Sequence, residues 1–304
     1  MLRQDLNRYV DIRRSLGFRF RIQHSLLKNF VAFAESRGDD FVRVDRVVDW
    51  AARAPSPASS RLRLLTVRRF ALAMQAEDIR YEVPSADAVG RVTFQRRTPY
   101  IYRSSEISAL LEAAAQLKPA GSIRPVMYAT LFGLLAVTGM RISEALALRL
   151  EDVTADGLIV RKTKFRKSRL LPLHGTTRQV LDGYLSTRLR LGTLDGSLFV
   201  STTGRGPPYP TVVAIFLMLV RTIGLRGKPG LPGPRIHDLR HTFAVRSLEQ
   251  CGHDRDAVAR HIVSLSTYLG HAHVSDTYWY LHATQALMER IAMAGETLHQ
   301  DHVP

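Results

Sequence analysis

The spacing of apolar residues divides the chain into a helical first part and a larger second part. From residue 4 to about residue 81, apolar side chains recur every three or four positions, as at Leu26, Phe30 and Phe33. That spacing is typical of helices with one buried face. The sequence therefore predicts a small helical domain at the start of the chain, with further helices over residues 44–53 and 60–76.

The helical spacing fails between Pro84 and Arg103. Pro84, Gly90 and Pro99 interrupt a polar stretch here, and such residues are common in connecting segments. We expect an interdomain linker that lies along the ligand. The predicted organisation is a helical domain over residues 1–83, a linker over 84–103, a second domain over 104–283 and a C-terminal tail over 284–304.

The sequence predicts that the second domain is mostly helical with a small sheet. Two short strand candidates, Leu158–Arg161 and Arg169–Leu173, flank a cationic turn at residues 162–167, which is the pattern of a hairpin. The predicted fold class is therefore mainly α with a small antiparallel sheet. The helices expected around this hairpin cover residues 105–116, 123–138, 142–148, 176–191 and 211–223.

Charge narrows the class of partner. The chain carries 43 Lys and Arg against 27 Asp and Glu, a formal net charge of +16 that attracts polyanions such as nucleic acid. An anionic membrane surface is the alternative, but the basic residues are spread along the chain and the apolar run 127–137 is too short to cross a bilayer. With one cysteine, Cys251, and no apolar leader, we expect a cytoplasmic, nucleoid-associated protein without a membrane partner.

Three segments carry side chains suited to phosphate chemistry. His237 and Arg240 fall three residues apart at the start of a predicted helix, and therefore on one helix face. Arg141 follows an apolar helix, and His271 precedes an aromatic cluster that ends at Tyr280. A guanidinium group near a core needs an anion, and its planar fork suits a phosphate.

These residues, in this order, resemble a known active site. The set Arg141, Lys164, His237, Arg240, His271 and Tyr280 is similar to the pattern of tyrosine recombinases, also called the phage integrase family. The resemblance covers about residues 104–280 and, more loosely, the helical first part, which resembles the core-binding domain of the family. It implies a site-specific DNA recombinase of a bacterial mobile element that works as an integrase or transposase.

The resemblance also implies the chemistry. Cleavage through a covalent intermediate needs a nucleophile, stabilisation of the phosphoryl charge and a proton for the departing oxygen. The 3′-phosphotyrosyl ester keeps the energy of the broken bond, so we expect no metal, nucleotide or other cofactor. The implied roles are attack by Tyr280, a phosphate clamp by Arg141 and Arg240, proton transfer by His237, protonation of the 5′-oxygen by Lys164 and a phosphate hydrogen bond from His271.

Three of these residues have competing interpretations. His237 and His241 have the spacing of a helical zinc pair, but Arg240 places a cation on the same face. Tyr278 is the rival nucleophile, although residues two apart on a helix cannot both reach one phosphate. Lys162 and Lys167 lie on the same hairpin as Lys164, and each is an alternative general acid.

Basic residues outside the active-site set are candidates for holding the DNA backbone. We expect double-stranded DNA as the partner, together with a homo-oligomer on DNA, dimer to tetramer. Related recombinases or DNA-bending accessory proteins are further partners, and a helix in the tail 284–304 is expected to dock on a neighbouring protomer. The candidate DNA-contacting residues are Arg61, Arg68, Arg69, Arg96, Arg97, Lys162, Arg166 and Lys167.

Two other functions fit part of the pattern. A type IB topoisomerase uses similar chemistry without site specificity. A catalytically silent accessory protein or repressor would bind a site and leave no covalent adduct. The complete set of residues favours the recombinase, because a protein that only binds DNA has no use for a tyrosine and a lysine at these positions.

Overall fold

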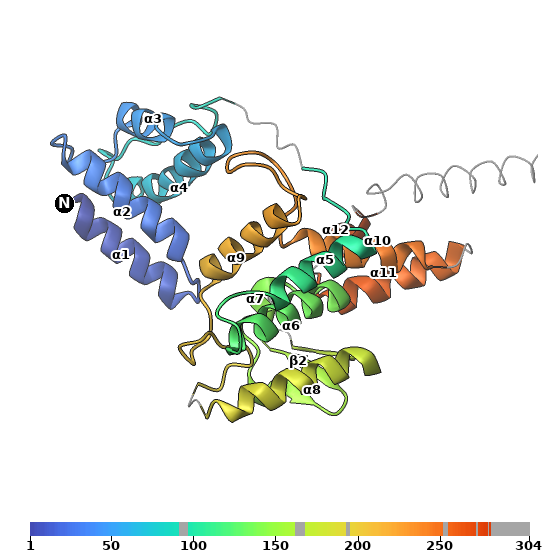
Figure 1. Cartoon of the computed structure of the whole chain (residues 1–304). Coiled ribbons are helices and arrows are strands. Elements are labelled where there is room, and N and C mark those ends of the chain that lie inside the picture. Colours follow the sequence, from blue (N-terminus) through green and yellow to red (C-terminus); the bar gives the residue numbers. More distant parts are fainter. Residues whose placement is uncertain are drawn as a thin grey trace, which may run out of the picture. The chain divides into compact units, whose positions relative to one another are not determined.

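The computed structural model describes residues 1–90, 97–161, 168–192, 195–251, 255–271, 273–278 and 280. By the packing of the backbone, the chain forms two compact units, Met1–Arg97 and Thr98–Pro304. We call them the N-terminal unit, blue to cyan in Figure 1, and the C-terminal unit, green to red. Each unit has its own buried apolar core.

The N-terminal unit consists of helices packed around aromatic and aliphatic side chains. Phe30 on α2 and Phe70 on α4 are fully buried, and Trp50 on α3 lies 5.4 Å from Phe30, measured between ring centroids. Ser56 caps α4 by accepting a hydrogen bond from Ser59 N, directly before a proline that suits a first helical position. The elements are α1 (Leu2–Ser15), α2 (Arg21–Glu35), α3 (Val44–Ala52) and α4 (Pro57–Gln75).

Both ends of the predicted linker 84–103 are attached to a unit. In the N-terminal unit, Arg68 donates a hydrogen bond to Pro84 O. In the C-terminal unit, Tyr102 N donates to Thr242 Oγ1 at 2.9 Å, and the Tyr102 side chain is buried. The boundary between the compact units lies at residue 97, within the predicted linker 84–103. Residues 91–96 lie outside the described residues.

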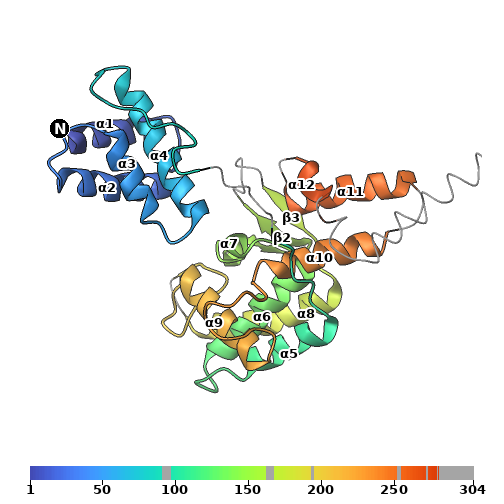
Figure 2. The same cartoon turned by 90° about the horizontal axis from the view of Figure 1, so that it is seen from above.

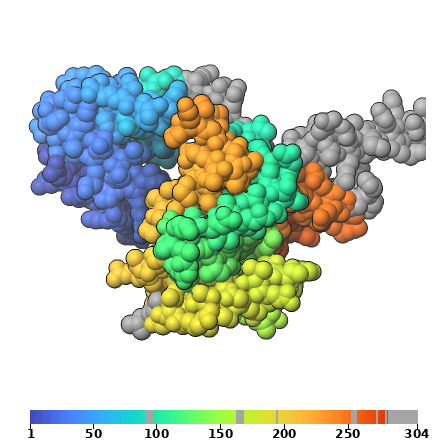
Figure 3. Space-filling view, viewed as in Figure 1, coloured from blue at the N-terminus to red at the C-terminus, as the bar shows by residue number. Residues whose placement is uncertain are grey.

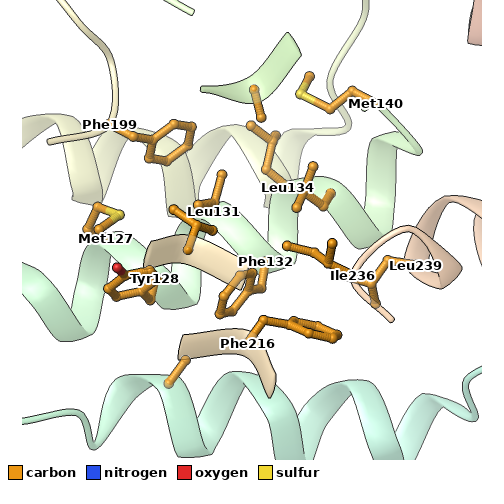
Figure 4. Close-up of a cluster of buried hydrophobic side chains, with 14 of the residues drawn as sticks. Met127, Tyr128, Leu131, Phe132, Leu134, Met140, Phe199, Phe216, Ile236 and Leu239 are labelled. Carbon is orange, nitrogen blue, oxygen red and sulfur yellow. The ribbon is translucent and has the colours of Figure 1, made fainter. Parts of the chain in front are cut away.

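The C-terminal unit is built around one helix that is buried on most sides. Figure 4 shows Leu131, Phe132 and Leu134 of this helix, α6, packed against Phe216 of α9 and Leu239 of α10. Helices α5 and α8 each pack against α6, and both lie on the face of the unit that is seen in the space-filling view (Figure 3). The helices are α5 (Ser104–Ala115), α6 (Ile123–Thr138), α7 (Ile142–Ala145), α8 (Gly175–Arg190), α9 (Tyr209–Thr222), α10 (Asp238–Glu249), α11 (Arg255–Leu269) and α12 (Ser275–Tyr278).

A small sheet completes this unit. Strands β1 (Val153–Thr154), β2 (Gly157–Val160) and β3 (Arg169–Leu171) follow the turn η1 (Leu150–Asp152) and pair antiparallel in the order β1-β2-β3. Val160 pairs with Arg169, which confirms the predicted hairpin on either side of residues 162–167. Figure 2 shows the sheet at the end of the unit that carries α7, α10 and α12. The predicted fold class, mainly α with a small antiparallel sheet, is confirmed.

One predicted helix is shorter than expected. The spacing of apolar residues predicts a helix over 142–148, whereas α7 ends at Ala145. The backbone turns away there because Leu148 O accepts a hydrogen bond from Leu198 N at 2.8 Å, and Leu150 N donates to Gly196 O at 2.9 Å. This pairing with a distant segment outweighs the local preference for helix.

Among the described residues, no helix combines the length and the apolar character that a membrane crossing requires.

Candidate active site

The His237–Arg240 motif begins α10, and its first turn is fixed from several sides. Asp238 is 1% exposed and accepts a hydrogen bond from Arg235 N at 2.8 Å, so that it closes the start of the helix. Thr242, one turn later, binds Tyr102 N as described above. A short, rigid first turn therefore carries both motif residues.

Arg240 is a buried cation that joins three segments of the chain. Its side chain donates to Gly139 O at 2.8 Å and to Leu269 O at 2.9 Å, although the residue is only 2% exposed. Gly139 has φ +59°, and a Cβ there would lie 2.5 Å from the ring of Phe243, so only glycine fits this turn. Burial, followed by the charge of Arg141, lowers the pKa of Arg240 to about 10, which leaves it charged at neutral pH.

Arg141 lies at the start of α7, beside Arg240. Its backbone N–H donates to Glu144 Oε2 at 3.0 Å and its Nη1 donates to Glu144 Oε1 at 2.8 Å. Its Nη2 also reaches Gly270 O at 3.4 Å. The side chain remains 29% exposed, so part of the guanidinium group is available to an incoming anion.

Tyr280 is buried among the motif residues. It is 3% exposed, and its ring centroid lies 5.4 Å from that of His241 and 6.1 Å from that of His271. Tyr280 is also close enough to Arg240 to raise the pKa of that guanidinium group, against the larger lowering by burial. Tyr278, the rival nucleophile, is 51% exposed. Of these two tyrosines, Tyr280 is the one that lies against the arginine and histidine side chains.

The two motif histidines are neutral in the free protein at pH 7. Desolvation, followed by the charge of Arg240, lowers the pKa of both His237 and His271 to about 4. The His237 ring reaches solvent on one side, but protein surrounds the rest of it. His271 Nδ1 is 2.7 Å from Thr277 Oγ1, a contact that orients the ring. A phosphate anion at the site would favour their protonated forms.

The structure therefore brings together five of the six predicted catalytic residues: Arg141, His237, Arg240, His271 and Tyr280. Lys164 lies outside the described residues, as do Arg96, Lys162, Arg166 and Lys167. Within the described part of the chain, no group of three or more His, Cys, Asp or Glu side chains is arranged to hold a metal ion.

The candidate DNA contacts of the N-terminal unit differ in exposure. Arg68 is engaged by Pro84 O, and Arg61 Nη1 lies 3.6 Å from Asp87 Oδ1, so both hold the segment that follows α4. Arg69 is exposed. Arg97 is described but lies at the end of the unit.

Sequence reasoning missed the backbone carbonyls that hold the two motif arginines and the arginine that binds Glu144. Arg169 on β3 binds Glu144, and the carbonyls of Gly139, Leu269 and Gly270 accept from the two motif arginines. One signal was present: each of these two glycines stands directly beside a motif, in Thr-Gly-Met-Arg and Leu-Gly-His. The contact of Arg169 left no such signal, because it depends on how β3 meets α7.

Comparisons with known proteins identify the family of the chain. Residues 101–286, more than half of the chain, match the model of the phage integrase family. A protein of Sinorhizobium fredii with the name integrase/recombinase y4rB is 38% identical over 94% of each chain. The tyrosine recombinase XerC of a Methylobacterium species is 31% identical over 78% of this chain and 69% of its own.

Solved structures show the same fold. A lambda integrase dimer bound to a COC′ core site matches 93% of this chain and 77% of its own, with a TM-score of 0.64 and 19% identity. The Tn1549 transposon integrase, in complex with transposon right end DNA, matches 96% and 99%, with a TM-score of 0.63 and 17% identity. From the family match and the identities above, the chain belongs to the phage integrase family, whose members are tyrosine recombinases that break and rejoin DNA strands.

Proposed function

We propose that this protein is a site-specific recombinase of a bacterial mobile element that cleaves DNA through a 3′-phosphotyrosyl intermediate formed by Tyr280. The observation that carries the proposal is the burial of Tyr280 against Arg240, His241 and His271. A phenol in a purely structural position has no need of a charged guanidinium partner. A nucleophile for phosphate does, because the same cation holds the phosphate that it attacks.

In the proposed cleavage step, the Tyr280 oxygen attacks the scissile phosphorus and the bond to the 5′-oxygen breaks. The products are a 3′-phosphotyrosyl ester and a free 5′-hydroxyl. Arg141 and Arg240 donate to the non-bridging oxygens, where negative charge grows. Religation is the reverse reaction, with a 5′-hydroxyl of the partner strand as the attacking group. No bond energy is lost between the two steps.

Two proton transfers accompany the attack. His237 takes the proton of the phenol, which is possible because its lowered pKa keeps the ring neutral and able to accept at pH 7. Lys164, which lies outside the described residues, is the proposed donor to the departing 5′-oxygen. His271, held by Thr277, donates to a phosphate oxygen once the ring is protonated or presents its second N–H.

The proposed assembly has several protomers on one DNA. Among the structural neighbours are a lambda integrase dimer on a core site and a lambda integrase tetramer on a Holliday junction. By analogy, we propose that this chain dimerises on each DNA site and forms a tetramer at synapsis. The tail 284–304 would dock on a neighbouring protomer, and other recombinases or DNA-bending proteins would assist where the element encodes them.

The direct test is the capture of a covalent adduct. The full-length protein is incubated with a pool of duplexes that carry a random central sequence and a nick, so that the cleaved product is trapped. DNA that stays attached to protein after denaturation is recovered, and the modified peptide is identified by mass spectrometry. We expect a 3′ adduct on Tyr280.

Tyr278→Phe is the matched control for Tyr280→Phe. The two changes remove the same hydroxyl from positions two residues apart, one exposed and one buried in the site. Tyr278→Phe should form adducts at the wild-type rate, and Tyr280→Phe should form none. Adducts that persist in Tyr280→Phe would refute the assignment of the nucleophile. Relaxation of supercoils without any preferred site would favour the topoisomerase, and binding without adducts would favour the silent accessory protein.

A further inference from the structure

Arg169 lies next to the proposed catalytic site but has no part in the mechanism above. It is the first residue of β3, and its side chain is 13% exposed. Nη2 donates to Glu144 Oε2 at 2.8 Å and Nη1 approaches Glu144 Oε1 at 3.3 Å. A buried guanidinium group thus holds both oxygens of one carboxylate, the geometry of a strong charge-assisted pair.

The carboxylate of Glu144 is shared between two arginines. The same two oxygens also accept from the backbone N–H and the Nη1 of Arg141. Glu144 is 8% exposed at its side chain, and burial raises its pKa, but the hydrogen bonds from Arg169 and Arg141 outweigh this and lower it. The group of three side chains therefore carries two positive charges and one negative charge, a net charge of +1.

Arg169 also contacts the turn that precedes His271. A Cβ at Gly270 would lie 2.8 Å from Arg169 Nη1, and Gly270 has φ +67°, so a glycine leaves the room that this guanidinium group occupies. Gly270 O accepts from Arg141, and the adjacent Leu269 O accepts from Arg240. Arg169 is thus packed against the turn that holds both proposed phosphate-binding arginines.

We propose that Arg169 is a positioning residue for strand cleavage: it balances the charge of Glu144 so that Arg141 keeps a net positive charge for the phosphate. Without Arg169, Glu144 and Arg141 form a neutral pair. The carboxylate then draws the guanidinium group toward itself and competes with the phosphate for its donors. This inference rests on the proposed function, because it assigns a step in the same cleavage reaction.

A purely structural ion pair is the competing explanation, and the sheet supplies a matched control for it. Arg161 directly follows β2, as Arg169 begins β3, and its Nε pairs with the buried carboxylate of Asp152. Among the described residues, Asp152 accepts from the backbone N–H of Arg149 and from Arg161, and neither of these is a motif residue. Arg161→Gln therefore removes an ion pair between an arginine beside the same sheet and a buried carboxylate, and leaves the site charge unchanged.

The experiment measures the single-turnover rate of adduct formation at saturating DNA, on duplexes recovered with the wild-type protein. Arg169→Gln should slow cleavage roughly 100-fold, because it weakens the electrostatic contact that Arg141 makes to the transition state, with DNA affinity changed less than about threefold. Arg161→Gln should also lower thermal stability, by less because Arg161 is more exposed, and should keep the wild-type rate. Arg169→Lys should fall between, because it restores the charge without the fork.

The double variant Glu144→Gln/Arg169→Gln separates charge from structure. Removing the carboxylate frees Arg141 again, so this variant should cleave roughly tenfold faster than Arg169→Gln alone, a recovery that a lost structural contact does not produce. Should Arg169→Gln fail to fold, the double variant and Arg169→Lys are compared with the wild type instead.

The outcomes are distinct. Cleavage by Arg169→Gln at the wild-type rate would overturn the inference, and so would a double variant that cleaves as slowly as Arg169→Gln alone. If the wild-type protein forms no adduct on any duplex, the proposed function itself fails, before Arg169 is tested.

Discussion

Arginines in both units donate hydrogen bonds to backbone carbonyls, but these bonds serve different roles in the two units. In the N-terminal unit, Arg63 of α4 donates to Trp50 O of α3, 13 residues away, and Arg68 donates to Pro84 O, 16 residues away. In the C-terminal unit, Arg240 and Arg141 bind carbonyls of Gly139, Leu269 and Gly270, which lie far away in the sequence. A carbonyl partner alone therefore says little about function.

What separates the two groups is convergence. Arg240 and Arg141 lie within electrostatic reach of one another and of both motif histidines, and Arg240 also touches Tyr280. Arg63 and Arg68 of the N-terminal unit bind two different segments, at Trp50 and at Pro84. Cations that lie close together repel one another, so hydrogen bonds from the surrounding fold must hold them in place. A bound anion reduces this repulsion.

The largest effect that sharpens this comparison is expected at Arg240. Arg240→Ala removes a phosphate donor and leaves Gly139 O and Leu269 O without their buried partner. Cleavage at saturating DNA should fall roughly 1,000-fold, as measured by single-turnover adduct formation. Arg63→Ala loses a carbonyl contact in the N-terminal unit and should cleave bound DNA at the wild-type rate. An equal loss of cleavage rate in both variants would show that Arg240 has no role in cleavage beyond its carbonyl contacts.

Glycines test how tightly each unit holds its turns. Gly139 and Gly38 both have positive φ, +59° and +77°, but a Cβ at Gly139 would meet Phe243, whereas nothing lies within 4 Å of a Cβ at Gly38. Gly139→Ala should lower the free energy of unfolding of its unit by roughly 2–4 kcal/mol, from backbone strain and overpacking together. Gly38→Ala should cost about 1 kcal/mol, from strain alone. Native-state hydrogen exchange reports the two units separately, and similar values at the two sites would contradict this reading.

The same contrast explains what could be predicted from the sequence. The motif residues were identifiable because their types and order are specific, and α6 and the β2–β3 hairpin followed from the spacing of apolar residues. Arg169 was not identifiable, because its role depends on the meeting of β3 with α7. The four basic side chains on α4 also look alike in sequence. Only the return of the chain past Pro84 and Asp87 shows that Arg68 and Arg61 are engaged within the unit.

The short α7 has a similar explanation. Local spacing favours a helix to residue 148, and no feature of that segment shows that its carbonyl pairs with Leu198, 50 residues later. Long-range backbone pairing of this kind is invisible to patterns read within a short window.

A smaller effect is expected with pH. The pKa of His237 and of His271 is about 4 in the folded protein and near 6.5 in an unfolded chain, so the unfolded state binds more protons between these values. The free energy of unfolding of the C-terminal unit should therefore fall as the pH drops from 6.5 to 4, by on the order of 1 kcal/mol after allowance for the solvent that reaches His237.

Hydrogen exchange at several pH values measures this slope in each unit. The variant His237→Asn/His271→Asn should flatten it in the C-terminal unit. In the N-terminal unit, His24 also has a lowered pKa, first from desolvation and then from Arg14, but it lies near the surface and should contribute less. A steeper slope in the N-terminal unit would contradict the view that the histidines whose pKa is lowered most lie at the proposed site.

The smallest effect concerns Arg68 and Arg69, two neighbouring arginines of α4 that differ in exposure. Arg69 is exposed and lines a hollow of about 460 Å³ together with Arg13, whereas Arg68 is engaged by Pro84 O. If Arg69 contacts a phosphate, Arg69→Ala should weaken DNA binding a few-fold and reduce the dependence of log affinity on log salt by about 1. Arg68→Ala should leave that slope unchanged and lower the stability of its unit by about 1 kcal/mol, because a buried carbonyl loses its donor. Titrations of both variants with DNA at several salt concentrations measure this slope. A reduced slope for Arg68→Ala would mean that an arginine bound to a backbone carbonyl of its own unit can still bind DNA. Exposure would then no longer separate the two kinds of arginine in this unit.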